Sequence, residues 1–154
     1  MAVPGAAKKS KIEVAIMTTP FAEDFKSRLS TASKKAAFNN WLDLEVDLAI
    51  EGKVELSLRW REEFGQYNGY LHASIVSGLI DTACGFAAST MSGAVLASQL
   101  SVRFFRPAVA EVFVVRGSVV KPSRTQIFTS AELFARGAPE KLLAAGDAVI
   151  VPIS

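Results

Sequence analysis

The sequence is poor in the residues that build metal sites and disulfides. Its 154 residues include one histidine, His72, and one cysteine, Cys84. A lone cysteine cannot form a disulfide within the chain, and this pair cannot supply the four histidine or cysteine ligands of a structural zinc site. We therefore expect no metal, no redox cofactor, and a reducing compartment, which we take to be the cytoplasm.

Long apolar runs and clusters of positive charge are also missing. The longest apolar candidate, residues 75–88, is interrupted by Asp81 and falls short of the roughly 18 residues needed to cross a bilayer. The first 16 residues are a poor match to a secretion signal. The net charge is only +2, and the lysines and arginines are scattered. We therefore expect neither a membrane nor a nucleic acid as partner.

The length and composition of the chain are typical of one globular domain, with 50% hydrophobic and 21% charged residues. Residues 1–18 contain proline, glycine and a lysine cluster, and we interpret them as a flexible arm. Residues 19–154 are predicted to form a single domain, with an N-terminal helix over 19–40 and a core over 41–154. Thr19 followed by Pro20 is a typical helix start.

From residue 42 the apolar period changes from about 3.6 to 2, which predicts strands. Residues 42–50 and 54–60 are expected to form a hairpin around Gly52 with one buried face. That face is expected to carry Leu42, Leu44, Val46, Leu48, Ile50, Val54, Leu56, Leu58 and Trp60.

A long, alanine-rich segment from Ala73 to about Thr90 is predicted to be the central helix. Gly78 and Gly85 lie near two turns apart on it, so we expect another backbone to approach this stripe closely. Four strand-like runs follow, and they predict an antiparallel meander. The fold class is therefore α+β, with a sheet of about six strands packed around one long helix. The runs are residues 95–105, 112–121, 126–134 and 142–153.

His72 stands directly before this helix. The N–H groups of Ala73 and Ser74 then lack partners inside the helix, and they point at whatever lies in front of it. Such donors, at the positive end of a helix dipole, can hold a carbonyl oxygen as it gains negative charge. The same residues would also suit a simple helix cap with a surface histidine.

Asp81 is the only ionisable side chain in the apolar part of this helix. Nine residues separate it from His72, which places the two on roughly opposite sides and about 13 Å apart along the axis. If both act on one substrate, Asp81 must come from a second copy of the chain, so we expect a homodimer with shared sites. Burial should disfavour ionisation of Asp81, which suits a general base or a nucleophile. The alternative is a carboxylate bonded to a loop backbone.

Other polar residues are candidates for contacts with a substrate. The amides of Gln66 and Asn68, in the loop before His72, could orient a water or a carbonyl. Ser98 lies near the start of a strand, and Arg124 borders a strand end, where a cation can meet phosphates. Cys84 has no cation or second histidine nearby, so we interpret it as a core residue.

A motif of glutamine, glycine, leucine and histidine is followed nine residues later by an aspartate, and then by a strand ending in Arg-Pro-Ala. Its members are Gln66, Gly69, Leu71, His72, Asp81, Val102, Phe104, Arg106, Pro107 and Ala108. From about residue 41 to 151 the chain resembles the hotdog-fold thioesterases of the phenylacetic-acid-pathway type. That family hydrolyses acyl-coenzyme A thioesters. Its sheets wrap a long helix and join edge to edge in dimers, which often pair again into tetramers.

The resemblance implies a role for each matching residue. Asp81 would be the base or nucleophile, and the N–H of Ala73 from the other subunit would polarise the thioester carbonyl. Gln66 and His72 would position the carbonyl and the attacking water. Ala73 and Ser74 stand where the family usually has two glycines, which puts rate or substrate range in question. Contacts with the rest of the substrate are assigned to Asn68, Gly69, Ser98 and Arg124.

Three functions are compatible with these residues. The first is an acyl-CoA thioesterase, with coenzyme A present only as part of its substrate. The second is a dehydratase or hydratase acting on acyl thioesters, which would add water without releasing a thiol. The third is a non-catalytic acyl-CoA binding or sensor protein, suggested by the alanine and serine at positions 73 and 74.

Overall fold

A computed structural model describes residues 20–153 as a curved sheet with helices on one side. The flexible arm predicted for residues 1–18 lies outside these residues. No helix in the described range is long and apolar enough to span a membrane. The elements in chain order are α2 (Pro20–Lys35), α3 (Ala37–Leu42), β1 (Glu45–Ile50), β2 (Lys53–Arg59), a 3-10 turn η1 (Glu62–Phe64), α4 (Ala73–Ser92), β3 (Val95–Phe104), β4 (Val112–Lys121), β5 (Ile127–Ala135) and β6 (Leu142–Pro152).

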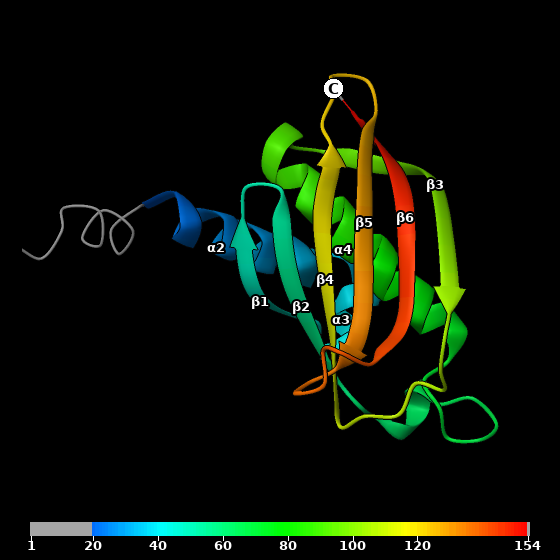
Figure 1. Cartoon of the computed structure of the whole chain (residues 1–154). Coiled ribbons are helices and arrows are strands. Elements are labelled where there is room, and N and C mark those ends of the chain that lie inside the picture. Colours follow the sequence, from blue (N-terminus) through cyan, green and yellow to red (C-terminus); the bar gives the residue numbers. More distant parts are fainter. Residues whose placement is uncertain (1–19, 154) are drawn as a thin grey trace, which may run out of the picture.

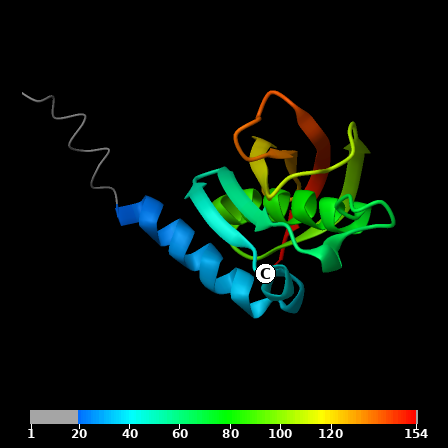
Figure 2. The ribbon, with the colours of Figure 1, turned by 90° about the horizontal axis from the view of Figure 1, so that it is seen from below.

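The six strands form one antiparallel sheet that curves around α4, in the order β1-β2-β4-β5-β6-β3 (Figure 1). Figure 2 shows α2 and α3 on the side of α4 that the sheet leaves open. This arrangement is a hotdog fold with an added N-terminal helix, so the predicted fold class is confirmed.

The predicted four-strand meander is wrong at its first strand. β3 does not pair with β4 but with β6, at the far edge of the sheet. The reason is that β2 already occupies the free side of β4. Residues 105–111 carry the chain from one edge back to the centre, passing the loop before α4, where the Leu71 N–H donates to the Ala108 carbonyl at 3.0 Å.

The first strand also differs from the expected alternation. A β-bulge shifts the register between Val46 and Leu48. An extra residue in a strand moves every later side chain to the other face. Ala49 is therefore buried, whereas Leu48 and Ile50, predicted to be inside, are 46% and 42% exposed.

The N-terminal helix is divided rather than continuous. Ala36 adopts an extended conformation between α2 and α3, with its N–H donated to the Ser33 carbonyl. The break turns α3 so that its aromatic side chains can contact the rest of the molecule. The ring of Trp41 meets Phe64 edge-on at 5.0 Å, which ties α3 to the loop that precedes α4.

Close packing of α4 depends on glycines in the sheet, not on those in the helix. A Cβ at Gly117 of β4 would fall 2.4 Å from the Ala83 carbonyl oxygen, so this glycine lets the backbone of α4 approach the sheet. The sequence predicted that another backbone approaches the helix glycines, but none does so among the described residues. Gly78 receives the ring of Phe38, and Gly85 faces open space.

Candidate active site

The start of α4 is capped by His72. Its extended backbone places Nδ1 where it accepts a hydrogen bond from the Ser74 N–H at 3.0 Å, and the Ser74 hydroxyl lies 2.7 Å from the same nitrogen. One of the two N–H groups predicted to be free is therefore already used. The N–H of Ala73 has no acceptor among the described residues, so it is the donor that remains for a ligand.

The loop before α4 is held by its own backbone. An isolated bridge pairs Gly65 with Leu71, and the Gln66 N–H donates to the Tyr70 carbonyl at 2.8 Å. Gly69 closes the turn with a φ of +74°, a conformation that favours glycine. The side-chain oxygen of Gln66 accepts from the Asn68 N–H at 2.6 Å. The loop therefore fixes the Gln66 amide while Asn68 and Gly69 stay exposed at its tip.

A small cavity of about 220 Å³ lies at this end of α4. Gln66 and Ala73 both line it, so the structure brings these two predicted site residues together. Its wall also includes Phe104 at the end of β3 and the Arg106-Pro107-Ala108 segment. His72 does not line it, because the exposed imidazole is engaged with Ser74.

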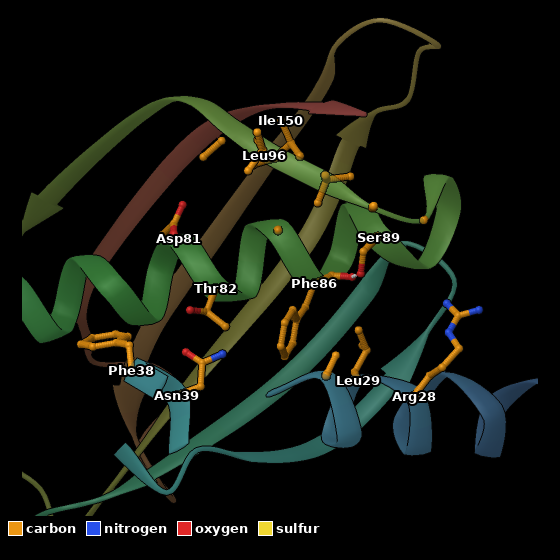
Figure 3. Close-up of a pocket in the computed structure, with 16 residues that line it drawn as sticks. Arg28, Leu29, Phe38, Asn39, Asp81, Thr82, Phe86, Ser89, Leu96 and Ile150 are labelled. Atoms are coloured by element: carbon orange, nitrogen blue, oxygen red, sulfur yellow. Dashed lines mark hydrogen bonds between the residues drawn. The ribbon is translucent and has the colours of Figure 1, made fainter. Parts of the chain in front are cut away.

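Asp81 lines a second, larger cavity of about 570 Å³ on the open side of α4 (Figure 3). α4 forms its floor, the start of β3 forms one wall, and α2 with α3 forms the opposite wall. In Figure 3 the Asp81 carboxylate points toward the β3 wall, where Leu96 and Ile150 lie. Most of the other lining side chains are apolar.

The Asp81 carboxylate is half-buried and enters none of the ion pairs found among the described residues. Burial raises the pKa of Asp81, as predicted, because the charged form loses hydration. Its neighbour Cys84 is fully buried, and burial raises the pKa of the Cys84 thiol to about 11. Cys84 is thus an inert core residue, while Asp81 is a carboxyl group open to a cavity.

Asp81 and Ala73 do not share a cavity within one chain. The two cavities lie at opposite ends of β3. The Asp81 cavity includes Val95 to Ala97 at the start of the strand, and the Ala73 cavity includes Phe104 at its end. Because β3 is an edge strand, no strand within residues 20–153 pairs with the backbone groups of its outer side.

The remaining predicted contacts lie outside both cavities. The Ser98 hydroxyl donates to the Val149 carbonyl at 3.2 Å, at a bulge between Ala97 and Gln99. Arg124 is exposed in the turn between β4 and β5. Among residues 20–153, no cluster of three or more histidine, cysteine, aspartate or glutamate side chains could hold a metal.

The N-terminal helices contribute site residues that sequence reasoning missed. Arg28, Leu29, Phe38 and Asn39 line the Asp81 cavity. From the sequence this segment was predicted only to form a helix over residues 19–40. The one available signal was the pair Asn39 and Asn40, which lies between the apolar residues Phe38 and Trp41 near the end of the predicted helix.

Comparisons with known proteins agree with the fold. A sequence model described as the thioesterase superfamily matches residues 68–140. A thioesterase family protein from Silicibacter pomeroyi has a crystal structure with a TM-score of 0.78 and 32% identity, covering 84% of this chain and 99% of that one. A Saccharolobus solfataricus protein, named provisionally as an esterase, is 29% identical over 94 residues, which is 60% of this chain and 67% of the relative.

The fold also matches the E. coli PaaI protein from the phenylacetic acid degradation operon, with a TM-score of 0.79, over 87% of this chain and 96% of that one. Their identity is only 16%, so this likeness concerns the fold alone. The fold is that of the hotdog proteins of this superfamily. The chain belongs to the thioesterase superfamily.

Proposed function

We propose that this protein is an acyl-CoA thioesterase whose active site is completed by a second copy of the chain. Water adds to the thioester carbonyl, the carbon–sulfur bond breaks, and the products are a carboxylic acid and the free thiol of coenzyme A. Asp81 accepts a proton from the attacking water, and that proton leaves with the thiol. Direct attack by the Asp81 carboxylate, followed by hydrolysis of the resulting anhydride, gives the same products.

The observation that carries this proposal is the position of the two cavities at opposite ends of an unpaired edge strand. If two copies pair antiparallel through β3 about a twofold axis, the start of one β3 lies beside the end of the other. Leu96 of one copy then lies near Phe104 of its partner, and the Asp81 cavity opens toward the partner's Ala73 cavity. The exposed apolar side chains of β3, among them Leu96, Leu100 and Phe104, support burial of this edge.

Each predicted residue has a role in such a shared site. The Ala73 N–H donates to the carbonyl oxygen as it gains charge, assisted by the dipole of the 20-residue helix behind it. Gln66 orients the thioester from the same cavity, and His72 fixes the start of α4 that presents the donor. Contacts with the coenzyme A portion are proposed for Asn68, Gly69, Ser98 and Arg124.

The finer assignments are also proposals. The motif from Gln66 to Ala108 supports a relation to the phenylacetic-acid-pathway type. Two such dimers could pair further into a tetramer. The single cysteine supports the cytoplasm as the location.

Complementation between two inactive variants tests the shared site. Asp81→Asn removes the base, and Ala73→Pro removes the oxyanion donor, since proline has no N–H and is well tolerated at the first position of a helix. The extended His72, with φ −63° and ψ 139°, is compatible with a following proline. Each variant alone should release thiol at least about 100-fold more slowly than the wild type from a panel of short, long, branched and aromatic acyl-CoAs.

Co-expression of the two variants in equal amounts should restore about a quarter of the wild-type rate, because half of the dimers are mixed and each mixed dimer has one intact site. Co-expression of Ala73→Pro with a double variant carrying both changes should restore nothing. Absence of restoration in the first mixture would contradict the shared site. Absence of thiol release by the wild type on every thioester would contradict thioesterase activity itself, and water addition to an enoyl thioester or binding without turnover would then favour the alternatives.

A further inference from the structure

Arg61 connects the loop before α4 to the N-terminal helices, although it lines neither of the two site cavities. It lies between β2 and η1. Its Nη2 donates to the carbonyl of Trp41 and also pairs with the Glu63 carboxylate at 2.9 Å. The guanidinium stacks over the ring of Phe64, with its central carbon 4.4 Å from the ring centroid. One side chain therefore holds α3 and η1 together.

The end of α3 explains why a cation is placed here. The last carbonyls of a helix have no partners within it, and they form the negative end of its dipole. Trp41 is the last but one residue of α3, so its carbonyl is one of these groups. The Arg61 guanidinium supplies the missing donor, and its planar shape also allows it to stack on Phe64. A lysine side chain has no planar group that could do both.

One donor of this guanidinium is left without a partner. The Nε–H of Arg61 is buried and forms no hydrogen bond among the described residues. A buried donor without an acceptor is unfavourable, because it has lost its hydrogen bond to water. An arginine in this position is therefore a poor choice for stability alone, which indicates a role in positioning its neighbours.

Phe64 links Arg61 to the start of α4. Its side chain is fully buried, and its carbonyl accepts a hydrogen bond from the His72 N–H at 2.9 Å. His72 is the capping residue of α4 and directly precedes Ala73, whose N–H is the oxyanion donor of the proposed site. A shift of Phe64 would therefore move the first turn of α4 and the Ala73 N–H with it.

We propose that Arg61 is a positioning residue, which holds the Ala73 N–H in place for catalysis through Phe64 and His72. This inference rests on the proposed function. The donor binds the carbonyl oxygen more strongly as that oxygen gains charge, so a misplaced donor should lower kcat and leave KM nearly unchanged. A displacement on the order of 1 Å can slow a reaction about 100-fold.

Arg116 on β4 provides a matched control. It also stacks on a buried phenylalanine, with its guanidinium carbon 4.6 Å from the ring centroid of Phe134, and it pairs with the Glu55 carboxylate at 2.6 Å. Unlike Arg61, it contacts neither α3 nor the loop before α4 through these interactions. The two arginines therefore have the same local chemistry in different places.

The kinetic test compares the two arginines by thiol release. Arg61→Met should lower kcat at least about tenfold and change KM less than about twofold. Arg116→Met should change neither constant. Arg61→Lys keeps the charge but loses the planar group, so it should be nearly as slow as Arg61→Met. A wild-type kcat in the lysine variant would overturn positioning through the stacked guanidinium.

A double variant separates the positioning of this donor from a general loss of structure. In an Ala73→Pro background the donor is already absent, so adding Arg61→Met should slow the enzyme little further. A further loss as large as that seen in the wild-type background would overturn the proposal, because Arg61 would then act independently of the Ala73 N–H.

Amide hydrogen exchange tests the structural link without any substrate. Arg61→Met should speed exchange of the His72 N–H, which Phe64 holds, while the strands of the sheet keep their protection. Arg116→Met should leave His72 protected. Arg61→Lys serves in both measurements if Arg61→Met does not fold.

The outcomes distinguish this inference from the proposed function. Unchanged protection of His72, or an unchanged kcat, in Arg61→Met would overturn the positioning role and leave the thioesterase intact. Absence of thiol release by the wild type would contradict the proposed function, and exchange at His72 would still decide whether Arg61 holds the start of α4.

Discussion

The ring of Phe38 occupies the space in which a side chain at position 78 would lie. A Cβ at Gly78 would come within 2.7 Å of Phe38 Cε1, closer than two carbon atoms can approach. Alanine at this position should gain about 1 kcal/mol of helix propensity over glycine. In the wild-type background we expect the displaced ring to cancel this gain, so Gly78→Ala should not raise the free energy of unfolding.

A double-mutant cycle measured by urea unfolding checks this relationship. In a Phe38→Ala background, Gly78→Ala should stabilise the protein by about 1 kcal/mol, which gives a coupling energy of about that size. Equal stabilisation in both backgrounds would show that the ring does not constrain position 78.

Gly117 should tolerate substitution far less well. Its missing side chain faces the Ala83 carbonyl at 2.4 Å, and backbone atoms of a central helix cannot move aside as a side chain can. We expect Gly117→Ala to destabilise the fold by about 3 kcal/mol, measured by chemical denaturation. The matched control is Gly85→Ala, which meets open space and should raise stability by up to about 1 kcal/mol. Similar losses for both variants would be inconsistent with the close approach of α4 at β4.

Gly78 and Gly85 show which part of the packing could not be predicted from the sequence. Periodicity located α4 and the strands well, because the apolar faces of both follow from local geometry. It could not tell whether Gly78 and Gly85 faced a backbone, a ring or a cavity, since that depends on which element packs against them. The position of β3 was missed for a similar reason. Four consecutive strand runs look alike whether the first pairs with its neighbour or crosses to the far edge.

Asp81 should make the stability of the protein depend on pH. Burial raises the pKa of Asp81 in the folded state, so the folded protein binds more protons than the unfolded chain above the ordinary aspartate pKa of about 3.9. Stability is therefore lost as the pH rises from there through the raised pKa. We expect Asp81→Asn to have a higher Tm than the wild type at neutral pH, with the gap closing below about pH 4.

Thermal unfolding across this pH range provides the measurement. Asp147→Asn serves as a comparison, because Asp147 is exposed and its ion pair with Arg103, at 3.0 Å, is of the weak surface kind. That variant should not gain stability at neutral pH. A Tm difference for Asp81→Asn that is constant with pH would argue against a buried charge at this position.

The same shift should appear in catalysis. If Asp81 acts as the base, it must be ionised, so kcat/KM should rise with pH through a pKa above the usual aspartate range. The profile is measured as thiol release from one good substrate at saturating and limiting concentrations. A rate that is already at its maximum near pH 4 would exclude Asp81 as the titrating base.

The two substitutions available at Ala73 separate its N–H from its methyl group. Ala73→Pro deletes the donor, and loss of one oxyanion donor typically costs about 10²–10³ in kcat. Ala73→Gly keeps the N–H and removes the methyl group that could narrow the approach of a thioester, so we expect its rate to equal or exceed that of the wild type. Circular dichroism should show unchanged helix content in both. A fast Ala73→Pro enzyme would rule out this N–H as the oxyanion donor.

Part of the candidate site could be predicted from the sequence, because it contains residue types that are uncommon in an apolar core. His72 and Asp81 stood out in an apolar context, and their helical spacing predicted that they cannot meet within one chain. Asn39 did not stand out, because an asparagine near a helix end is ordinary. Only its burial distinguishes it from Asn40, and burial depends on how α3 turns after Ala36.

The unpaired edge of β3 also makes the stability of the folded chain depend on protein concentration. β3 spans ten residues, from Val95 to Phe104, and no strand in the described part of the chain pairs with the backbone groups on its outer side. If a second copy binds there, mass action stabilises the folded chain, and its melting temperature climbs with protein concentration. At low protein concentration the chains would remain single, each with an unpaired edge and incomplete sites. The active fraction of the protein would then rise with its concentration.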